Sequence, residues 1–378
     1  MEFSLSEEQT LLRDSLNKYF LDNYDFRSRQ NIVATGEGYS RSHWASYAEL
    51  GWLSVPFDES LGGYGGQIED TAILCEQMGR ALALEPFLAN VILVGPLLAC
   101  SDKRHLVSSL IDGSVQFALA YAERNGRQDV FNVQTKAKPE GQNYMLSGDK
   151  VLVLNGMTAR YLVVTARTSG KSNDTSGITL FLVDCEKQNI HRQEIFLMDG
   201  TRAANISLDN IVLSADDIVG QVGEANTMLE STVAEARIAI TAEAIGIMDV
   251  LREKTLEYTK TREQFGVAIS SFQALQHRLV EMFMATEQAR SMLYRAICEY
   301  QQKDARVLST IAATKAFVGE KGRLIGEEAI QIHGGMGMTD ELDIGHYVKR
   351  LMMLHHLFGD ADSTYREYFS SATFAEGV

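Results

Sequence analysis

Proline is scarce in this sequence: it occurs four times in 378 residues, and none follows Pro139. A proline inside a helix removes an N–H donor and clashes with the preceding turn, so it ends or bends most helices that contain it. The last part of the chain is therefore free to form long, uninterrupted helices. We predict three of these, over about 226–259, 272–301 and 305–332, followed by two shorter ones.

Cysteine is equally scarce. The four cysteines, Cys75, Cys100, Cys185 and Cys298, show neither CxxC pairing nor the spacing of metal ligands. We therefore expect reduced cysteines that pack in the core, and we expect no metal site.

Basic residues are outnumbered, with 35 Lys and Arg against 50 Asp and Glu, which gives a net charge of −15. Nucleic acids and anionic membranes attract basic surfaces, so we expect neither as a partner. No segment reaches 18 apolar residues, and the first residues lack the basic region and apolar core of a signal peptide. These absences predict a cytoplasmic protein.

The patterns that are present divide the chain into three predicted domains. Residues 1–112 read as helical, beginning at Ser6 with apolar positions Leu11, Leu12, Leu16 and Phe20. Residues 113–221 contain short alternating segments separated by Gly, Asn, Asp and Ser clusters, which are typical of an antiparallel sheet or small barrel. Residues 222–378 are helical again. The fold class expected from this order is α+β.

A glycine-rich stretch, Gln331–Glu341, interrupts the last helical region. Gly334, Gly335 and Gly337 permit positive φ and a close approach of the backbone to another surface. The preceding helix would end here and present Gln331 beside bare backbone, an arrangement that suits phosphate or the polar edge of a heterocycle. The alternative is a plain turn between two helices.

A second stretch, Lys260–Gly266 with Phe272–His277, lies between two predicted helices. Arg262 closes the first helix, and its planar guanidinium suits a pyrophosphate. Gln273 begins the next helix and is placed to bond an adenine or ribose edge. The alternative for Arg262 is a simple interaction with the negative end of its own helix.

The order of blocks and these two motifs resemble the acyl-CoA dehydrogenase family over essentially the whole chain. The resemblance implies that family's fold: an N-terminal all-α domain, a middle antiparallel β-barrel or sheet domain, and a C-terminal four-helix bundle. It also implies FAD as cofactor, bound across a subunit interface. The residues expected to clamp the adenosine and pyrophosphate of a neighbour's FAD are Arg262, Gln264, Phe265, Gln273, Gln331, Gly334 and Gly335.

The chemistry that the resemblance implies is α,β-desaturation of an acyl-CoA thioester. A carboxylate removes the α-proton, the β-hydrogen leaves as hydride to the flavin, and an electron-transfer flavoprotein accepts the electrons. The two positions where family members carry this carboxylate are occupied here by Gly359 and Ala236. Asp360 and Glu243 are the nearest candidate bases, although a helix cap for Asp360 and a structural role for Glu243 are the competing interpretations.

The flavin-ring side also departs from the family. The run Ala122–Asp129 replaces the usual Thr-Glu-Pro-Gly-x-Gly-Ser-Asp loop, and Leu152-Val153-Leu154 replaces Trp-Ile-Thr or Trp-Ile-Ser. Apolar side chains donate no hydrogen bond to the flavin, so only backbone amides are left for that role.

The chain thus keeps the half of the site that grips a neighbour's FAD and loses the half that holds its own flavin and base. This pattern resembles the smaller subunit of heteromeric acyl-CoA dehydrogenases of the pimeloyl-CoA or steroid side-chain type. We therefore expect an α2β2 assembly with a homologous subunit, active in fatty acid or steroid side-chain β-oxidation. One alternative is a self-sufficient homo-oligomer that uses Asp360 or Glu243 as base, and another is a catalytically silent scaffold on the same fold.

Overall fold

The computed structural model describes residues 5–126, 129–188 and 190–375. The chain divides into two compact units, each described below by itself. The helical unit combines Met1–Gln30, Ile68–Ala83 and Arg237–Val378. The mixed unit combines Asn31–Gln67 and Leu84–Ala236.

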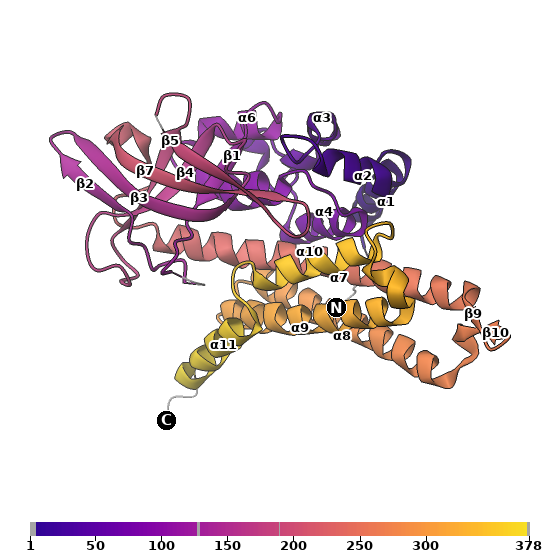
Figure 1. Cartoon of the computed structure of the whole chain (residues 1–378). Coiled ribbons are helices and arrows are strands. Elements are labelled where there is room, and N and C mark those ends of the chain that lie inside the picture. The colour runs from indigo at the N-terminus through magenta and orange to yellow at the C-terminus, as the bar shows by residue number, and fades with distance from the viewer. Residues whose placement is uncertain (1–4, 127–128, 189, 376–378) are drawn as a thin grey trace. The chain divides into compact units, whose positions relative to one another are not determined.

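Long helices dominate the helical unit (Figure 1). Its elements are α1 (Glu7–Asn23), α4 (Ile68–Ala81), β9 (Glu263–Gln264), β10 (Val267–Ala268), η6 (Ile269–Ser271), α8 (Gln273–Gln301), α9 (Val307–His333), η7 (Gly334–Met338), α10 (Ile344–His356) and α11 (Ala361–Ala375). Two helices cross the boundary between the units, α2 (Phe26–Val33) and α7 (Asn226–Thr261).

Short helices and a sheet make up the mixed unit. The helices are α3 (Arg41–Glu49), η1 (Trp52–Ser54), η2 (Glu59–Leu61), η3 (Leu88–Val94), α5 (Gly95–Ala99), η4 (Arg104–Leu106), α6 (Val107–Ile111) and η5 (Ala215–Asp217). The strands are β1 (Phe117–Ala120), β2 (Lys136–Glu140), β3 (Asn143–Leu154), β4 (Tyr161–Arg167), β5 (Ile178–Asp184), β6 (His191–Phe196), β7 (Arg202–Ser214) and β8 (Ile218–Val219).

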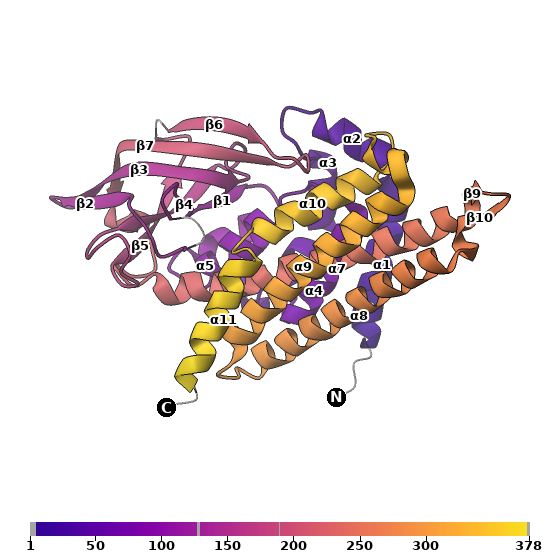
Figure 2. The same ribbon diagram turned by 60° about the horizontal axis from the view of Figure 1, so that its bottom comes forward.

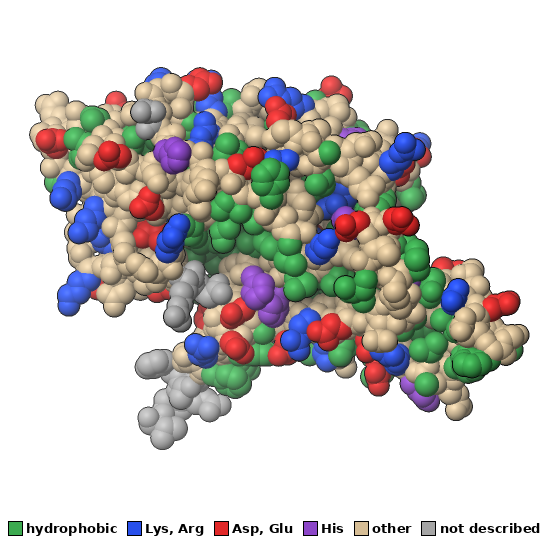
Figure 3. Space-filling model, viewed as in Figure 1, with side chains coloured by type: hydrophobic (Ala, Val, Ile, Leu, Met, Phe, Trp, Pro, Cys, Tyr) green, Lys and Arg blue, Asp and Glu red, His purple; other side chains and the backbone are tan. Residues whose placement is uncertain are grey.

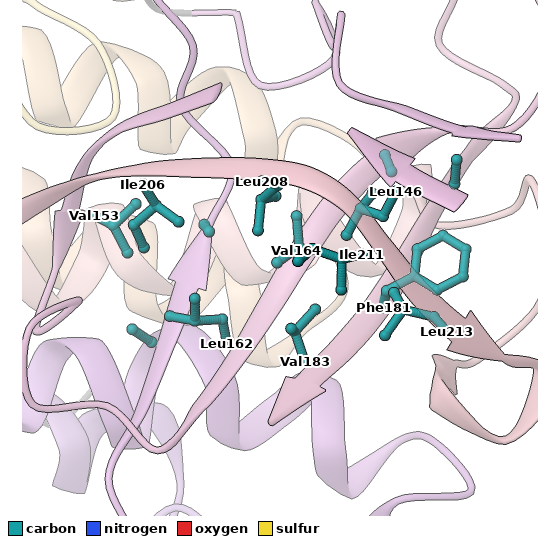
Figure 4. Close-up of a cluster of buried hydrophobic side chains, with 14 of the residues drawn as sticks. Leu146, Val153, Leu162, Val164, Phe181, Val183, Ile206, Leu208, Ile211 and Leu213 are labelled. Carbon is teal, nitrogen blue, oxygen red and sulfur yellow. The ribbon is translucent and has the colours of Figure 1, made fainter. Parts of the chain in front are cut away.

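The sheet runs in the order β6-β7-β3-β2-β4-β5-β8, with β1 beside β4. Most neighbours are antiparallel, as predicted, whereas β1 and β4 run parallel, and β2 meets β4 at a single parallel pair. Alternate residues of the central strands point into one apolar core (Figure 4). In this core Leu162 lies opposite Val183, and Val164 lies opposite Phe181, with all four side chains fully buried.

A buried ion pair lies within the mixed unit. The Lys150 ammonium is fully buried and donates to Glu123 Oε1 at 2.6 Å and to Thr165 Oγ1 at 2.8 Å. The Glu123 carboxylate also accepts the backbone N–H groups of Gln134 and Thr135 at 2.7 and 3.0 Å. Burial lowers the pKa of Lys150 to about 8, although the Glu123 charge opposes this shift. The pair therefore fixes the start of the 122–129 loop; Arg127 and Gln128 of that loop lie outside the described residues.

Helix α1 begins as predicted. Ser6 and Gln9 form a reciprocal capping box, with each backbone N–H donating to the other's side chain at 3.1 Å. Of the apolar positions that mark this helix in the sequence, Leu16 and Phe20 are buried, whereas Leu11 is 70% exposed. The reason is that α1 packs mainly against α4 and buries only a narrow face.

In the rest of the helical unit, α9 packs against α8, α10 and α11 (Figures 1 and 2). Helices α4 and α7 cross at two glycines. A Cβ on Gly79 would lie 2.2 Å from the carbonyl oxygen of Glu243, and a Cβ on Gly246 would lie 2.0 Å from that of Glu76. Each helix thus presents a glycine to the backbone of the other, and no larger residue fits at this separation.

We predict that Gly246→Ala lowers the free energy of unfolding. The new methyl would meet a backbone carbonyl, and such overpacking costs about 1–3 kcal/mol, enough to outweigh the gain of about 1 kcal/mol in helix propensity. Chemical denaturation measures the effect. Gly36→Ala is the matched control, because nothing lies within 4 Å of its added Cβ. Equal stabilities of the two variants would contradict the close crossing.

We also predict that Lys150→Met destabilises the protein by about 3–5 kcal/mol, because it leaves the Glu123 carboxylate buried without its countercharge. Lys187→Ala is the control, since Lys187 is 77% exposed in its ion pair with Asp184 and should contribute about 1 kcal/mol or less. A Lys150→Met variant as stable as the control would show that Glu123 does not need this ammonium.

Candidate functional site

The segment between α7 and α8 forms a tight hairpin in which Gln264 pairs with Val267. The two central residues, Phe265 and Gly266, have φ of +55° and +80°. Positive φ at both positions is the geometry of a type I′ turn, which glycine adopts freely and phenylalanine adopts only at a cost. The Phe265 side chain is 93% exposed. A strained backbone that holds an aromatic ring in solvent is a feature of functional sites.

Three polar side chains near this hairpin are exposed and have no partner among the described residues. Arg262, Gln273 and Gln331 are all exposed, and none makes a side-chain hydrogen bond or ion pair within the described part of the chain. The Gln264 amide donates only to the adjacent carbonyl of Glu263, at 2.8 Å. These groups are free to bond another molecule.

The end of α9 exposes bare backbone to solvent. Gly334 has φ of +63°, and its N–H donates to the carbonyls of Ile330 and Gln331, which ends the helix as predicted. Gly334 and Gly335 are exposed, and a Cβ on either would meet no atom within 4 Å. A side chain at position 335 would therefore clash with nothing in the described chain. A ligand that lies directly against the backbone would explain why this position is glycine.

The two motifs meet at one end of the helical unit. The Tyr258 hydroxyl, one turn before Arg262, donates to the His333 carbonyl at 3.4 Å, and the two rings stack with centroids 4.3 Å apart. Arg278 of α8 forms an ion pair with Glu328 of α9. The β9–β10 hairpin lies at this end of α7 and α8 (Figure 2). Sequence reasoning missed Tyr258, although its position one turn before Arg262 marks the same helix end.

The turn between α10 and α11 contains one family base position, Gly359, and is bonded by Arg237. Arg237, which follows Ala236, donates from Nε to the carbonyl of Phe358 at 2.9 Å, and Gly359 follows Phe358. Phe358 and Gly359 have φ of +55° and +107°, and a Cβ on Gly359 would lie 2.8 Å from Thr364 Cγ2. Gly359 is therefore required by the turn, and no carboxylate occupies either position.

Two cations hold this turn. Arg237 pairs in a bidentate manner with Glu367, with both N–O distances 2.8 Å. The Lys315 ammonium is buried and donates to the carbonyls of His355 and Gly359 at 3.0 Å each. Burial and, secondarily, the nearby Arg237 charge lower the pKa of Lys315 to about 7, while the Asp360 charge opposes the shift. Lys315 was missed in the sequence, where the signal is a lysine between the buried Ile311 and Val318 on one helix stripe.

The two candidate bases each have structural partners. Asp360 is half-buried and accepts the N–H of Ser363 at 2.9 Å, which caps the start of α11. This hydrogen bond, with the Ser363 hydroxyl, lowers the pKa of Asp360, the opposite of what a general base in a dry pocket requires. Glu243 accepts hydrogen bonds from Arg350 at 2.6 and 3.0 Å. These contacts favour the structural interpretations of both carboxylates.

The segment that replaces the family's flavin-facing residues contains a β-bulge. The register of β3 against β7 shifts between Lys150 and Val153, and Leu152 has φ of +51° and is 52% exposed. Its N–H donates to Asn205 Oδ1 at 3.3 Å, so this backbone donor is already used within the chain.

The described residues contain neither a membrane-spanning helix nor a metal-binding cluster. None of their helices is both long and apolar enough to cross a membrane. No group of three or more His, Cys, Asp or Glu side chains is arranged there to hold a metal ion. On the face drawn in Figure 3, the described acidic and basic side chains are interspersed.

Three domain models of one family match most of the chain. The acyl-CoA dehydrogenase N-terminal domain matches residues 6–104, the middle domain matches 118–211, and the C-terminal domain matches 226–366.

Similar proteins include a probable acyl-CoA dehydrogenase, YngJ, of Bacillus subtilis (strain 168), 29% identical over 91% of this chain and 92% of that protein. The L-prolyl-[peptidyl-carrier protein] dehydrogenase of Serratia sp. (strain ATCC 39006) is 27% identical over 93% of each chain.

Among solved structures, an FAD complex of PigA has a TM-score of 0.91 at 25% identity and covers 100% of both chains. A variant of a steroid ACAD designated Tcur3481-Tcur3483 has a TM-score of 0.89 at 25% identity, covering 99% of this chain and 100% of that one. The fold predicted from the sequence is thereby confirmed, and this chain belongs to the acyl-CoA dehydrogenase family.

Proposed function

We propose that this chain is a subunit of an FAD-dependent acyl-CoA dehydrogenase and that it completes the FAD site of a homologous partner in an α2β2 assembly. The observation that carries the proposal is a contrast in the helical unit. The exposed side chains of Arg262, Gln273 and Gln331 donate to no described residue. At the turn before α11, by contrast, the side chains of Arg237 and Lys315 donate within the chain.

The hairpin end fits the adenosine and pyrophosphate half of FAD. Arg262 offers a planar set of donors that matches phosphate oxygens. Gln273 is the first residue of α8, and the N-terminus of a helix favours an anion. Gln331 and the open backbone at Gly334 and Gly335 suit the edge and face of a heterocycle. The exposed Phe265 ring offers an apolar surface for packing.

The flavin supplies the hydride acceptor when bound, and in this proposal the chain's own residues only bind and orient its distal half. The partner would supply the carboxylate that removes the α-proton. Support for this division comes from Gly359 and Ala236: the first is locked by its turn, and the second is fully buried with an apolar side chain. Acyl-CoA thioesters are the proposed substrates, and an electron-transfer flavoprotein is the proposed electron acceptor.

Two of the similar structures support parts of this assignment. The similar structure of PigA contains bound FAD, which favours FAD as the cofactor of this chain. The similar structure Tcur3481-Tcur3483 is a steroid ACAD with two protein names, which supports our proposal of a heteromeric assembly. A self-sufficient homo-oligomer would need Asp360 or Glu243 to leave its present partners before it could act as a base.

We predict that Arg262→Ala in this chain weakens FAD binding by the assembled enzyme by about 10- to 100-fold, since a charge-assisted hydrogen bond contributes about 1.5–3 kcal/mol. Fluorescence titration of the deflavinated complex measures the change. Lys260→Ala is the control, because Lys260 is exposed and already pairs with Glu257 at 2.6 Å. Equal losses in both variants would indicate a general charge effect and would contradict a specific role for Arg262.

We also predict that Asp360→Asn leaves the turnover of the assembled enzyme within about twofold of the unmodified enzyme, whereas loss of a general base costs about 10²- to 10⁴-fold. Asparagine caps helices as well as aspartate does, so the fold should be kept. Glu243→Gln should lower thermal stability by weakening the pair with Arg350 and should likewise spare turnover. A hundredfold loss of turnover in either folded variant would favour the self-sufficient alternative.

A further inference from the structure

A cavity of about 480 Å³ lies in the helical unit between α1, α4 and α8. Its walls include the apolar side chains of Ala72, Ile73, Leu293 and Ile297. The volume is within the range of small-molecule sites, about 300–1,000 Å³. The cavity shares no lining residue with the surface that we assign to FAD or with the turn before α11 at Phe358 and Gly359. Its role is therefore separate from the proposed function.

One buried polar group in this cavity wall lacks a partner. Gln77 is 5% exposed, and its Oε1 accepts no hydrogen bond from any described residue. A buried acceptor without a donor costs free energy, and nearly all such groups in native proteins are satisfied. The position of Gln77 among apolar neighbours thus points to a donor that comes from outside the chain.

The charges around the cavity select the kind of donor. Glu69 and Glu76 line it. Of the two arginines that line it, Arg13 is bound to Asp14 at 3.0 Å, and Arg290 is bound to Glu76 at 2.9 Å and to Asp249. The basic groups are therefore already paired with carboxylates, and the remaining carboxylate oxygens favour a cationic or neutral donor over an anion.

Gln77 also borders a second cavity, of about 470 Å³, beneath the other end of α1. That cavity is lined by three basic residues, Arg29, Arg80 and Lys254, and by one acidic residue, Asp343, so its lining is more positive than that of the first cavity, which has two residues of each sign. The cavity that contains Glu69 and Glu76 is consequently the one that suits a donor beside Gln77.

We propose that the cavity between α1, α4 and α8 is a second ligand site, which binds an amphipathic molecule with an alkyl body and an amine head. The alkyl chain lies against Ile73, Leu293 and Ile297. The ammonium donates to Gln77 Oε1. Glu76 is already paired with Arg290, whereas Glu69 has no basic partner among the described residues and supplies the net negative charge that favours a cationic head group. No covalent step is involved.

Calorimetric titration of the full chain tests this with three probes that share one alkyl chain: decylamine, decan-1-ol and decanoate, each below its aggregation concentration. We expect decylamine to bind at least tenfold more tightly than decanoate, with decan-1-ol between them. Absence of binding, or equal affinity for decylamine and decanoate, would overturn the proposal.

Two variants separate the head-group contact from the cavity. Gln77→Met keeps the length of the side chain but removes the acceptor, so the preference for decylamine should fall by about fivefold, the value of one hydrogen bond. Ile73→Trp fills the cavity and should abolish binding of all three probes. Gln221→Met, at an exposed glutamine of the mixed unit, is the control and should change nothing. Binding that survives Ile73→Trp would mean association elsewhere on the surface.

A measurement without ligand provides an independent check. Because Gln77→Met removes an unsatisfied acceptor, the unliganded variant should melt at the same temperature as the unmodified protein or higher. A clear fall in melting temperature would mean that Gln77 already has a bound partner, such as water, and would overturn the assignment of Oε1 to a ligand.

Discussion

The close crossing of α4 and α7 is the constraint on which both functional regions of the helical unit depend. Gly79 and Gly246 let each helix touch the backbone of the other, and no side chain fits between them. This contact fixes the position and rotation of α7. Arg237 then reaches the turn before α11, and Tyr258 supports the end of α9. These two residues are roughly 30 Å apart along the helix axis, at about 1.5 Å per residue.

The turn before α11 and the β9–β10 hairpin use their polar groups in opposite ways. At the turn before α11, Arg237 and Lys315 satisfy backbone carbonyls, and the positive φ of Gly359 excludes the side chain that a base would need. Near the hairpin, Arg262 has no partner in the described chain, and Phe265 keeps a costly backbone conformation to hold its ring in solvent. Hydrogen bonds within the chain make the turn before α11 rigid. At the hairpin, unused hydrogen-bond donors and a strained backbone are expected where another molecule completes the contacts.

Signals between neighbours in the sequence were sufficient to predict much of this structure. The helix periodicity, the cap at Ser6 and the glycine stop at Gly334 depend on neighbours in sequence, and each was predicted. The parallel β1–β4 pair, the Lys150–Glu123 pair and the glycine crossing depend on residues far apart in the chain, and a single sequence contains no signal for their partners. The exposure of Leu11 depends on such a contact too, since periodicity marks an apolar stripe but does not tell how much of it a neighbour covers.

We propose that this chain completes a flavin site and does not hold one by itself. The most direct test is the number of FAD molecules per chain, measured by flavin absorbance and native mass spectrometry after purification alone and after co-expression with a homologous subunit. We expect no flavin on the chain alone and one FAD per pair of subunits in the complex. One tightly bound FAD per chain in the protein purified alone would contradict it.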